Sequence, residues 1–274
     1  MDKEFPSRPV AVAGYSGRIH SDFNTSPFLK KLASIDTLLD SPEARILLKG
    51  RNRVAAVSFP VSSGKTNEII IKEFRLRGVN LLKTLILPSK AKKAWRGSVG
   101  LVQREIPTPF PVAYLEQKKG LMVEKCFFLS RKIPFFQEIR FLFRDLKGGA
   151  LVNLLEHLAA FLRQIHRQGV LHRDLSDGNI LVRREGSGYT FFLVDTNRIR
   201  FRKRVGLYSG IKSLVRLGIA SHYQRFFLEK YRGNIGLSQT VWLWYKLGKN
   251  TFSAYLRVKK ALGLKKLARK LGVQ

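Results

Sequence analysis

The sequence predicts an α+β protein of two lobes, the first rich in strands and the second helical, with a cleft between them. Its 274 residues are long for one small domain and short for two large ones, and 45% of them are hydrophobic, enough for a substantial core. Strand-like segments come first along the chain and helical patterns follow, which is the order expected of two such lobes. The joint between the lobes is expected near residues 124–131.

The first lobe is predicted to span residues 26–127, after an N-terminal arm of residues 1–25. The arm is rich in Gly, Ser and Pro and lacks sustained periodicity, apart from one short strand expected near residues 10–13. Ser26-Pro27 then provides a helix start, and apolar residues recur at helical spacing up to the stop at Asp40-Ser41-Pro42. One short helix is therefore expected there.

Apolar runs predict two groups of strands in the remainder of the first lobe. Three strands separated by turn-rich segments are expected to form an antiparallel meander, at residues 45–48, 54–59 and 68–74. A basic helix is predicted over residues 89–104, and it ends where prolines force an extended connection. A further strand pair is expected at residues 112–116 and 121–127.

The second lobe is predicted to cover residues 128–274 and to contain a long helix. Leucine and isoleucine recur every three or four residues from Leu151 to Ile165, which predicts a helix buried along one face. Two apolar strands follow, residues 180–182 and 191–194, with a glycine-containing hairpin turn between them. The chemistry predicted below lies around this hairpin.

The charge of the chain points to an anionic partner. Lys and Arg number 51 against 19 Asp and Glu, which gives a net charge of +32. The single cysteine, Cys126, excludes an internal disulfide and a cysteine-rich zinc site, and it favours a reducing compartment. Polar residues interrupt the most apolar stretch, 150–162, so we expect no membrane span, and the first residues show no export signal.

Three oxygen-bearing side chains are placed around the predicted hairpin. Residues 172–179 read HRDLSDGN and supply Asp174 and Asn179, and the second strand of the hairpin ends at Asp195. Phosphoryl transfer uses such a set: one carboxylate orients the attacking hydroxyl and accepts its proton, while an amide oxygen and a second carboxylate hold magnesium. These residues therefore predict a phosphotransferase site.

This segment resembles the catalytic segment of the protein-kinase-like fold, in which the loop reads His-Arg-Asp-Leu and an asparagine follows the aspartate by five residues. The resemblance implies an ATP cleft between the lobes, Asp174 as catalytic base, and Asn179 and Asp195 as Mg²⁺ ligands. It also implies that Lys72, on the strand of residues 68–74, contacts the phosphates of ATP. Within this fold, the loop, the ending at residues 194–198 and the approach at residues 107–109 look most like the lipopolysaccharide kinase (Kdo/WaaP) family.

The sequence departs from the kinase pattern in its nucleotide-binding half. The glycine-rich phosphate loop is reduced to Gly50 among basic residues, so side chains and backbone are both expected to hold the triphosphate. No acidic residue stands between Glu73 and Glu105, so the helix expected to pair a glutamate with Lys72 has none to offer. Asp195 and Glu105 are the remaining candidates for that partner, and a rearranged site or a weakened enzyme are both consistent with the sequence.

The C-terminal part of the second lobe is strongly basic. Residues 201–274 contain 17 Lys and Arg against one acid, Glu229. Residues 263–272 place leucines on one helical face and cations on the other, which suits an anionic membrane surface. Trp242, Trp244 and Tyr245 are either interfacial anchors or part of the core of the helical lobe. Nucleic acid is the less favoured anion, since charge alone points to it.

Together these features predict an ATP- and Mg²⁺-dependent kinase that phosphorylates a sugar hydroxyl of an anionic glycolipid, such as Kdo or heptose of the lipopolysaccharide inner core. An anionic acceptor suits a chain with a net charge of +32. We therefore expect a peripheral protein at the cytoplasmic face of the inner membrane. Two alternatives remain: a RIO-like atypical protein kinase associated with a ribonucleoprotein, and a pseudokinase that binds lipid or a partner without catalysis.

Overall fold

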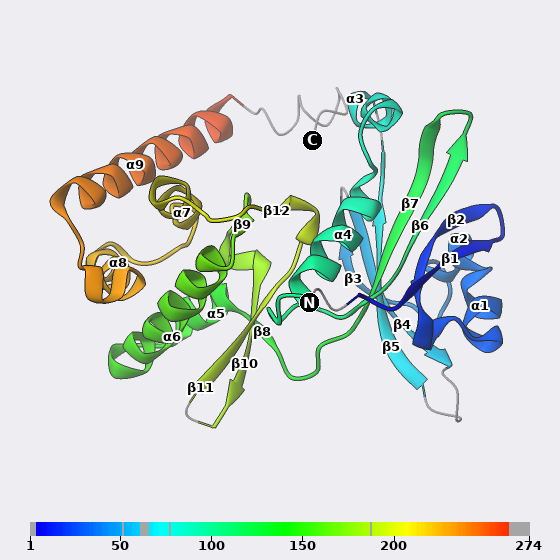
Figure 1. Cartoon of the computed structure of the whole chain (residues 1–274), viewed down its shortest axis with the longest axis horizontal. Coiled ribbons are helices and arrows are strands. Elements are labelled where there is room, and N and C mark those ends of the chain that lie inside the picture. Colours follow the sequence, from blue (N-terminus) through cyan, green and yellow to red (C-terminus); the bar gives the residue numbers. More distant parts are fainter. Residues whose placement is uncertain (1–3, 51, 61–65, 77, 187, 263–274) are drawn as a thin grey trace. The chain divides into compact units, whose positions relative to one another are not determined.

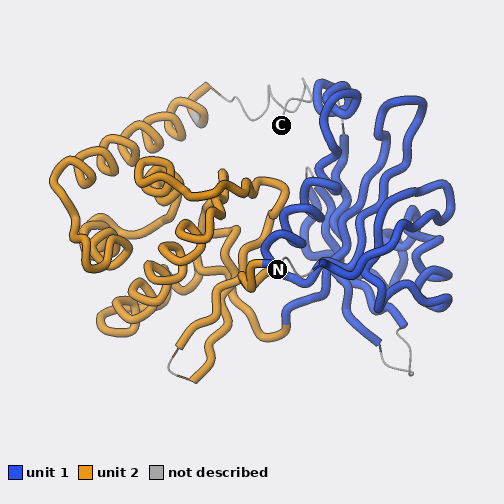
Figure 2. Tube along the Cα trace, viewed as in Figure 1, with its two compact units in different colours: residues 1–103, 109–133, 265–274 blue, residues 104–108, 134–264 orange. Residues whose placement is uncertain are grey.

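The computed structural model describes residues 4–50, 52–60, 66–76, 78–186 and 188–262 (Figure 1). These residues divide into two compact units (Figure 2). The first contains the described residues up to Gln103 together with Pro109–Ile133, and the second contains Arg104–Thr108 and the described residues after Pro134. Strands dominate the first unit and helices the second, so the predicted α+β class is confirmed.

The first unit is built on a seven-stranded antiparallel sheet with the order β1-β2-β6-β7-β5-β4-β3. Its strands are β1 (Ser7–Val12), β2 (Tyr15–His20), β3 (Arg45–Lys49), β4 (Asn52–Pro60), β5 (Thr66–Phe74), β6 (Pro111–Lys119) and β7 (Met122–Arg131). The meander β3-β4-β5 and the pair β6-β7 lie where the sequence predicts them. Strand β7 runs on to Arg131, so the first unit extends beyond the boundary expected at residue 127.

The first residues form part of this sheet, which corrects the expectation of an N-terminal arm. Strands β1 and β2 make a hairpin, and β2 pairs with β6. The hairpin is stable because Tyr15 and Ile19 alternate into the core. Gly17 allows the close approach of the strands, since a Cβ at this position would lie 1.8 Å from the carbonyl oxygen of Tyr114.

Helices cover both faces of the sheet (Figure 1). In the first unit these are α1 (Ser26–Leu32), α2 (Ile35–Leu38), α3 (Val79–Leu82) and α4 (Lys90–Val102), with 3₁₀ turns η1 (Ser21–Phe23) and η2 (Lys83–Leu85). Phe28 and Leu32 of α1 pack against Phe59 and its neighbours on one face, whereas Trp95 of α4 packs against Phe128 on the other. The single helix expected after Ser26 is thus two, α1 and α2.

The second unit contains two small sheets and five helices among its described residues. The sheets have the orders β11-β10-β8 and β12-β9. Their strands are β8 (Gln137–Glu138), β9 (Val170–His172), β10 (Ile180–Glu185), β11 (Gly188–Leu193) and β12 (Ile199–Phe201). The helices are α5 (Ile139–Asp145), α6 (Gly148–Arg167), α7 (Leu207–Leu214), α8 (Gln224–Arg232) and α9 (Gln239–Ala261). Short 3₁₀ turns are η3 (Asp177–Asn179), η4 (Thr196–Arg198), η5 (Ser221–Tyr223) and η6 (Gly233–Ile235).

Helix α6 is the predicted long helix, and its leucine face is buried as expected. Leu151, Leu155, Leu158, Leu162 and Ile165 are all buried. Apolar burial on this scale contributes roughly 1.5–3 kcal/mol for each fully buried side chain. The helix is therefore the main hydrophobic support for the strands and loops around it.

The basic C-terminal segment is only partly described by the structure. The amphipathic helix predicted at residues 263–272 lies outside the described residues. Of the three candidate interfacial rings, Tyr245 is buried in the second unit whereas Trp244 is exposed. None of the helices within the described ranges is long and apolar enough to cross a bilayer.

Candidate active site

His172 ends strand β9 and ties the loop that follows it to the residue after strand β11. Its imidazole Nδ1 accepts a hydrogen bond from the backbone N–H of Asp174 (3.2 Å), and Nε2 lies 3.0 Å from the carbonyl oxygen of Val194. Nδ1 therefore carries no proton and Nε2 donates, which makes the ring neutral. Burial lowers the pKa of His172 and favours the same neutral form. His172 thus supports the loop.

Asp174 and Asn179 are held together by the loop between them. The side-chain Nδ2 of Asn179 donates to the carbonyl oxygen of Asp174 (2.7 Å), and its backbone N–H donates to Ser176 (2.8 Å). A carbonyl oxygen only accepts, so Nδ2 faces it, and Oδ1 is the side-chain atom of Asn179 that could bind a cation. The loop places the two predicted site residues side by side.

Asp195 is brought to the same loop by the neighbouring strand. The N–H of Val194 donates to the carbonyl oxygen of Asn179 (3.1 Å), so Asp195 follows directly after a residue bonded to the loop. Asp195 has φ 56° and ψ 44°, a left-handed conformation that is rare outside glycine and that clusters at functional sites. The geometry therefore brings Asp174, Asn179 and Asp195 together, as the sequence predicts.

These residues fit a magnesium ion, which prefers oxygen ligands. The left-handed turn at Asp195 and the oriented amide of Asn179 supply one carboxylate and one amide oxygen. Across the described part of the chain, no three His, Cys, Asp or Glu side chains are grouped to hold a metal by themselves. An ion at this site would therefore take its remaining ligands from phosphate groups and water, which is usual for Mg²⁺.

Two residues near the loop were not predicted as part of the site. Asp177 accepts a hydrogen bond from the N–H of Gly218 (2.7 Å), which fastens the segment after α7 to η3. Burial raises the pKa of Asp177, and the bond from Gly218 opposes that rise. The guanidinium of Arg216, in the same segment, is paired with Oδ1 of Asp174. Arg216 lies 42 positions from Asp174, and no local pattern in the sequence marks it.

Lys72 stands near the end of β5, in the interior of the seven-stranded sheet of the first unit. Its cross-strand neighbours are Val54 on β4 and Phe128 on β7, and its ammonium group lies 5.0 Å from the ring centre of Phe74. Phe74 and Phe128 pack with α4, so Lys72 points to the sheet face that this helix covers. Helix α4 (Lys90–Val102) carries no acidic residue, which agrees with the missing glutamate noted in the sequence.

Gly50 lies in the exposed turn between β3 and β4, where its N–H donates to the carbonyl oxygen of Asn52 (3.2 Å). No atom lies within 4 Å of a Cβ built at Gly50, so the packing does not require glycine there. Nearby, the guanidinium of Arg53 contacts both carboxylate oxygens of Asp40. This pairing lowers the pKa of Asp40, and it engages one of the cations that surround Gly50.

The structure thus gathers three of the five predicted site residues. Asp174, Asn179 and Asp195 lie on one hydrogen-bonded loop and strand end of the second unit, whereas Lys72 and Gly50 belong to the first unit. The nucleotide role of Lys72 and Gly50, and the ATP cleft between the lobes, stay predictions.

Part of the chain matches a known protein family. The model of the lipopolysaccharide kinase (Kdo/WaaP) family matches residues 88–218. No curated protein matches the sequence. Among solved structures, WaaP in complex with acyl carrier protein is 18% identical, with 88% of this chain and 92% of that chain covered and a TM-score of 0.48. A MAP kinase from Leishmania major is also 18% identical, with 68% and 59% covered and a TM-score of 0.39.

The family match includes the complete catalytic loop. Residues 88–218 contain Asp174, Asn179 and Asp195, and they also contain Asp177 and Arg216, which the sequence alone did not single out. The family is one of kinases, which agrees with the phosphotransferase chemistry predicted from the loop. The resemblance of this chain to the lipopolysaccharide kinase (Kdo/WaaP) family is therefore confirmed over residues 88–218.

Proposed function

We propose that the protein transfers the terminal phosphate of ATP to a sugar hydroxyl of an anionic glycolipid, with Kdo or heptose of the lipopolysaccharide inner core as the acceptor. The observation that carries this proposal is the loop in which Asn179 is bonded to Asp174 and to the strand that delivers Asp195. The match to a family of lipopolysaccharide kinases over this loop supports the choice of acceptor.

In this mechanism the carboxylate of Asp174 orients the acceptor hydroxyl and accepts its proton. The hydroxyl oxygen attacks the terminal phosphorus of ATP, and the bond from that phosphorus to the bridging oxygen breaks and releases ADP. His172 keeps the loop in place through its contacts to Asp174 and Val194. Lys72 steadies the phosphates of the nucleotide from the first unit.

Asn179 and Asp195 would hold Mg²⁺ through their side-chain oxygens. The ion, when bound, would neutralise charge on the nucleotide phosphates. Because Nδ2 of Asn179 donates to the Asp174 carbonyl, Oδ1 is the side-chain atom of Asn179 that would bind the ion. The role of the protein at this point is to keep these two oxygens in position before the nucleotide arrives.

The charge of the chain supports an anionic acceptor. A protein of +32 attracts a glycolipid that already bears phosphates and carboxylates, and the same charge attracts the surface of an anionic membrane. We therefore place the protein at the cytoplasmic face of the inner membrane as a peripheral protein. Weak, steeply salt-dependent binding to RNA would be a by-product of the charge.

The nucleotide site is tested by thermal unfolding with ATP and Mg²⁺. A ligand of the folded state raises Tm by mass action, by about 3–8 °C at one hundred times Kd for a chain of this size. We expect this rise in the unmodified protein and in Asp145→Ala, an exposed control acid bonded to Arg144. We expect it to be lost in Asp195→Ala. Equal rises in all three proteins would contradict the assignment of Asp195.

Experiments of the same kind distinguish two other functions from the proposed one. The absence of an acidic residue from α4 is compatible with a pseudokinase, which would show no magnesium-dependent rise in Tm at millimolar ATP. A RIO-like protein kinase would transfer phosphate to a protein substrate of a ribonucleoprotein and not to lipopolysaccharide. Transfer of labelled phosphate from ATP to purified lipopolysaccharide, lost in Asp174→Ala, supports the glycolipid kinase over both.

A further inference from the structure

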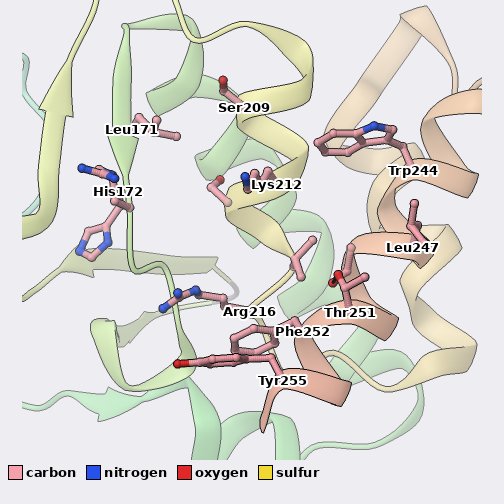
Figure 3. A pocket seen from close by; sticks show the side chains of 14 residues that line it. Leu171, His172, Ser209, Lys212, Arg216, Trp244, Leu247, Thr251, Phe252 and Tyr255 are labelled. Carbon is pink, nitrogen blue, oxygen red and sulfur yellow. Dashed lines mark hydrogen bonds between the residues drawn. The ribbon is translucent and has the colours of Figure 1, made fainter. Parts of the chain in front are cut away.

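A cavity of about 720 Å³ lies within the second unit, beside the catalytic loop (Figure 3). It is bordered by the end of β9, by α7 and the residues that follow it, and by α9. We call it the α7–α9 pocket. Its volume falls within the range of pockets that bind small molecules. Asp174, Asn179 and Asp195 are not among the residues that line it.

The lining of the pocket combines positive charge with aromatic surface. The cations and rings that line it are Arg173, Lys212, Arg216, Trp244, Phe252 and Tyr255. None of its lining residues, all within the described ranges, is acidic. Cations favour an anionic group, and aromatic rings favour a flat or ring-shaped body beside it. The pocket thus suits a ring that carries negative charge.

Arg216 joins the pocket to the catalytic base. Its guanidinium is paired with Oδ1 of Asp174 and also lies 5.3 Å from the ring centre of Phe252. In Figure 3, Arg216 lies at the same end of the pocket as Phe252 and Tyr255. The two paired side chains are 41% and 29% exposed, and an ion pair with this much solvent contact is weak. A second anion in the pocket is therefore able to replace Asp174 as the partner of Arg216.

The backbone that carries Arg216 is fixed, even though its side chain is exposed. Gly218 donates to Asp177 in η3, and the ammonium of Lys249 donates to the carbonyl oxygen of Leu217. A Cβ at Gly218 would lie 2.2 Å from a carboxylate oxygen of Asp177, so the segment is tightly packed against the loop. Arg216 is therefore kept within reach of Asp174 while its guanidinium remains able to turn.

We propose that the α7–α9 pocket binds an anionic group already present on the acceptor sugar, a phosphate or a carboxylate. In this proposal the anionic group replaces Asp174 as the ion-pair partner of Arg216. The inference rests on the proposed function, because it assigns the pocket to the acceptor of that reaction. Without acceptor, a guanidinium N–H occupies Oδ1 of Asp174. With acceptor bound, Arg216 turns to the anion, and Oδ1 becomes the atom that accepts the hydroxyl proton. Arg216 is thus a specificity-determining residue that couples acceptor binding to release of the base.

The first experiment measures binding by calorimetry with three soluble probes and no nucleotide: glucose 1-phosphate, inorganic phosphate and methyl glucoside. We expect glucose 1-phosphate to bind most tightly, since it has both the ring and the anion, and methyl glucoside to bind most weakly. Arg216→Ala should weaken binding of glucose 1-phosphate by about 10- to 100-fold. Arg216→Lys should keep part of the affinity, because it retains the charge but loses the planar fork.

The matched control is Arg184→Ala, an exposed arginine on β10 that does not line the pocket and whose Nε donates to Gly186. It removes the same charge from the same unit and should leave the affinity unchanged. Equal loss in Arg184→Ala and Arg216→Ala would mean that net charge alone binds the probe, and the proposal would be overturned. Tight binding of methyl glucoside would overturn it as well.

The second experiment tests the exchange itself. If Asp174 competes with the anion for Arg216, Asp174→Asn should raise the affinity for glucose 1-phosphate by about two- to fivefold. The same substitution made in the Arg216→Ala background should raise it less, because the competition has been removed. Equal gains in both backgrounds would show that Asp174 acts only through long-range repulsion and would refute the exchange.

The failure of this inference is distinguishable from failure of the proposed function. The pocket experiments contain no nucleotide and measure no phosphate transfer. Their outcome therefore does not depend on whether ATP raises the Tm of the unmodified protein or on whether Asp195→Ala abolishes that rise. Conversely, an active kinase in which Arg216→Ala leaves the KM for lipopolysaccharide unchanged would retain the proposed function and reject the pocket.

Discussion

The catalytic loop of the second unit and strand β5 of the first unit hold their site residues by different means. In the loop, side chains bond to the backbone: His172 to Val194, and Asn179 to Asp174. On β5, Lys72 is placed by strand pairing, with Val54 and Phe128 as its neighbours. A loop therefore needs particular polar residues to keep its shape, whereas a sheet positions whatever residue occurs at that register. The difference predicts unequal sensitivity to substitution.

The largest expected effect is on catalysis, where substitutions in the two regions should change different kinetic parameters. Asp174→Ala should lower kcat by about 10²- to 10⁴-fold, because a positioned base contributes on that scale. Lys72→Met should act mainly on the KM for ATP, with an increase of about tenfold, since it removes one charge from the nucleotide phosphates. Steady-state kinetics with lipopolysaccharide as acceptor measure both. Equal losses of kcat would show that Lys72 is as integral to the reaction as the loop.

The next largest effect is on stability, and it compares one glycine from each unit. Gly169 precedes β9 with φ +75°, and a Cβ there would lie 1.9 Å from the carbonyl oxygen of Arg202. Gly169→Ala should therefore lower the free energy of unfolding by about 3 kcal/mol or more. Gly50→Ala, in the open turn between β3 and β4, should change it by less than about 0.5 kcal/mol. Urea unfolding followed by circular dichroism compares the two, and a stable Gly169→Ala protein would contradict the packing described here.

A smaller effect is expected from acid, through a buried histidine of the second unit. His166 of α6 is buried with its Nδ1 2.7 Å from the hydroxyl oxygen of Tyr231 on α8, and burial lowers the pKa of His166 from 6.5 to about 4. The unfolded chain binds the proton more readily, so stability is present above pH 6.5 and is lost as the pH falls toward 4. The loss between pH 7 and pH 5 should be about 2 kcal/mol.

The variant His166→Gln tests this pH dependence, because glutamine keeps a polar side chain but does not titrate in this range. The free energy of unfolding of the variant, measured in urea at pH 7 and pH 5, should change less with pH than that of the unmodified protein. An unchanged slope would mean that His166 is protonated in the folded state or that other groups determine the acid sensitivity.

The same contrast explains what the sequence revealed and what it did not. The loop was predictable because Asp174 and Asn179 are close in sequence and belong to one recognisable pattern. Arg216 was not, since it is one of 51 basic residues and reaches Asp174 only through the fold. Asp177 lies within the pattern, but its bond to Gly218 depends on a segment 41 positions away.

The fold shows a similar division between local and distant information. Strands β3, β4 and β5 and helix α6 have strong local patterns, and the structure places them where the sequence predicts them. Strands β1 and β2 are short, and β2 contains a glycine. They form a hairpin that is stabilised by the pairing of β2 with β6, which is about 100 positions away in the chain. The prediction of an arm was wrong because this segment is ordered by pairing with that distant strand.

The position of Cys126 has a practical consequence for spectroscopy. Its thiol is the only one in the chain, it is fully buried on β7, and burial raises its pKa to about 11. At neutral pH it is neither ionised nor accessible, so it reacts poorly with maleimides and other alkylating reagents. A cysteine introduced at an exposed site would be labelled selectively while the native residue remains in place. The protein is thus a natural background for fluorophores or spin labels that report on the movement of each unit.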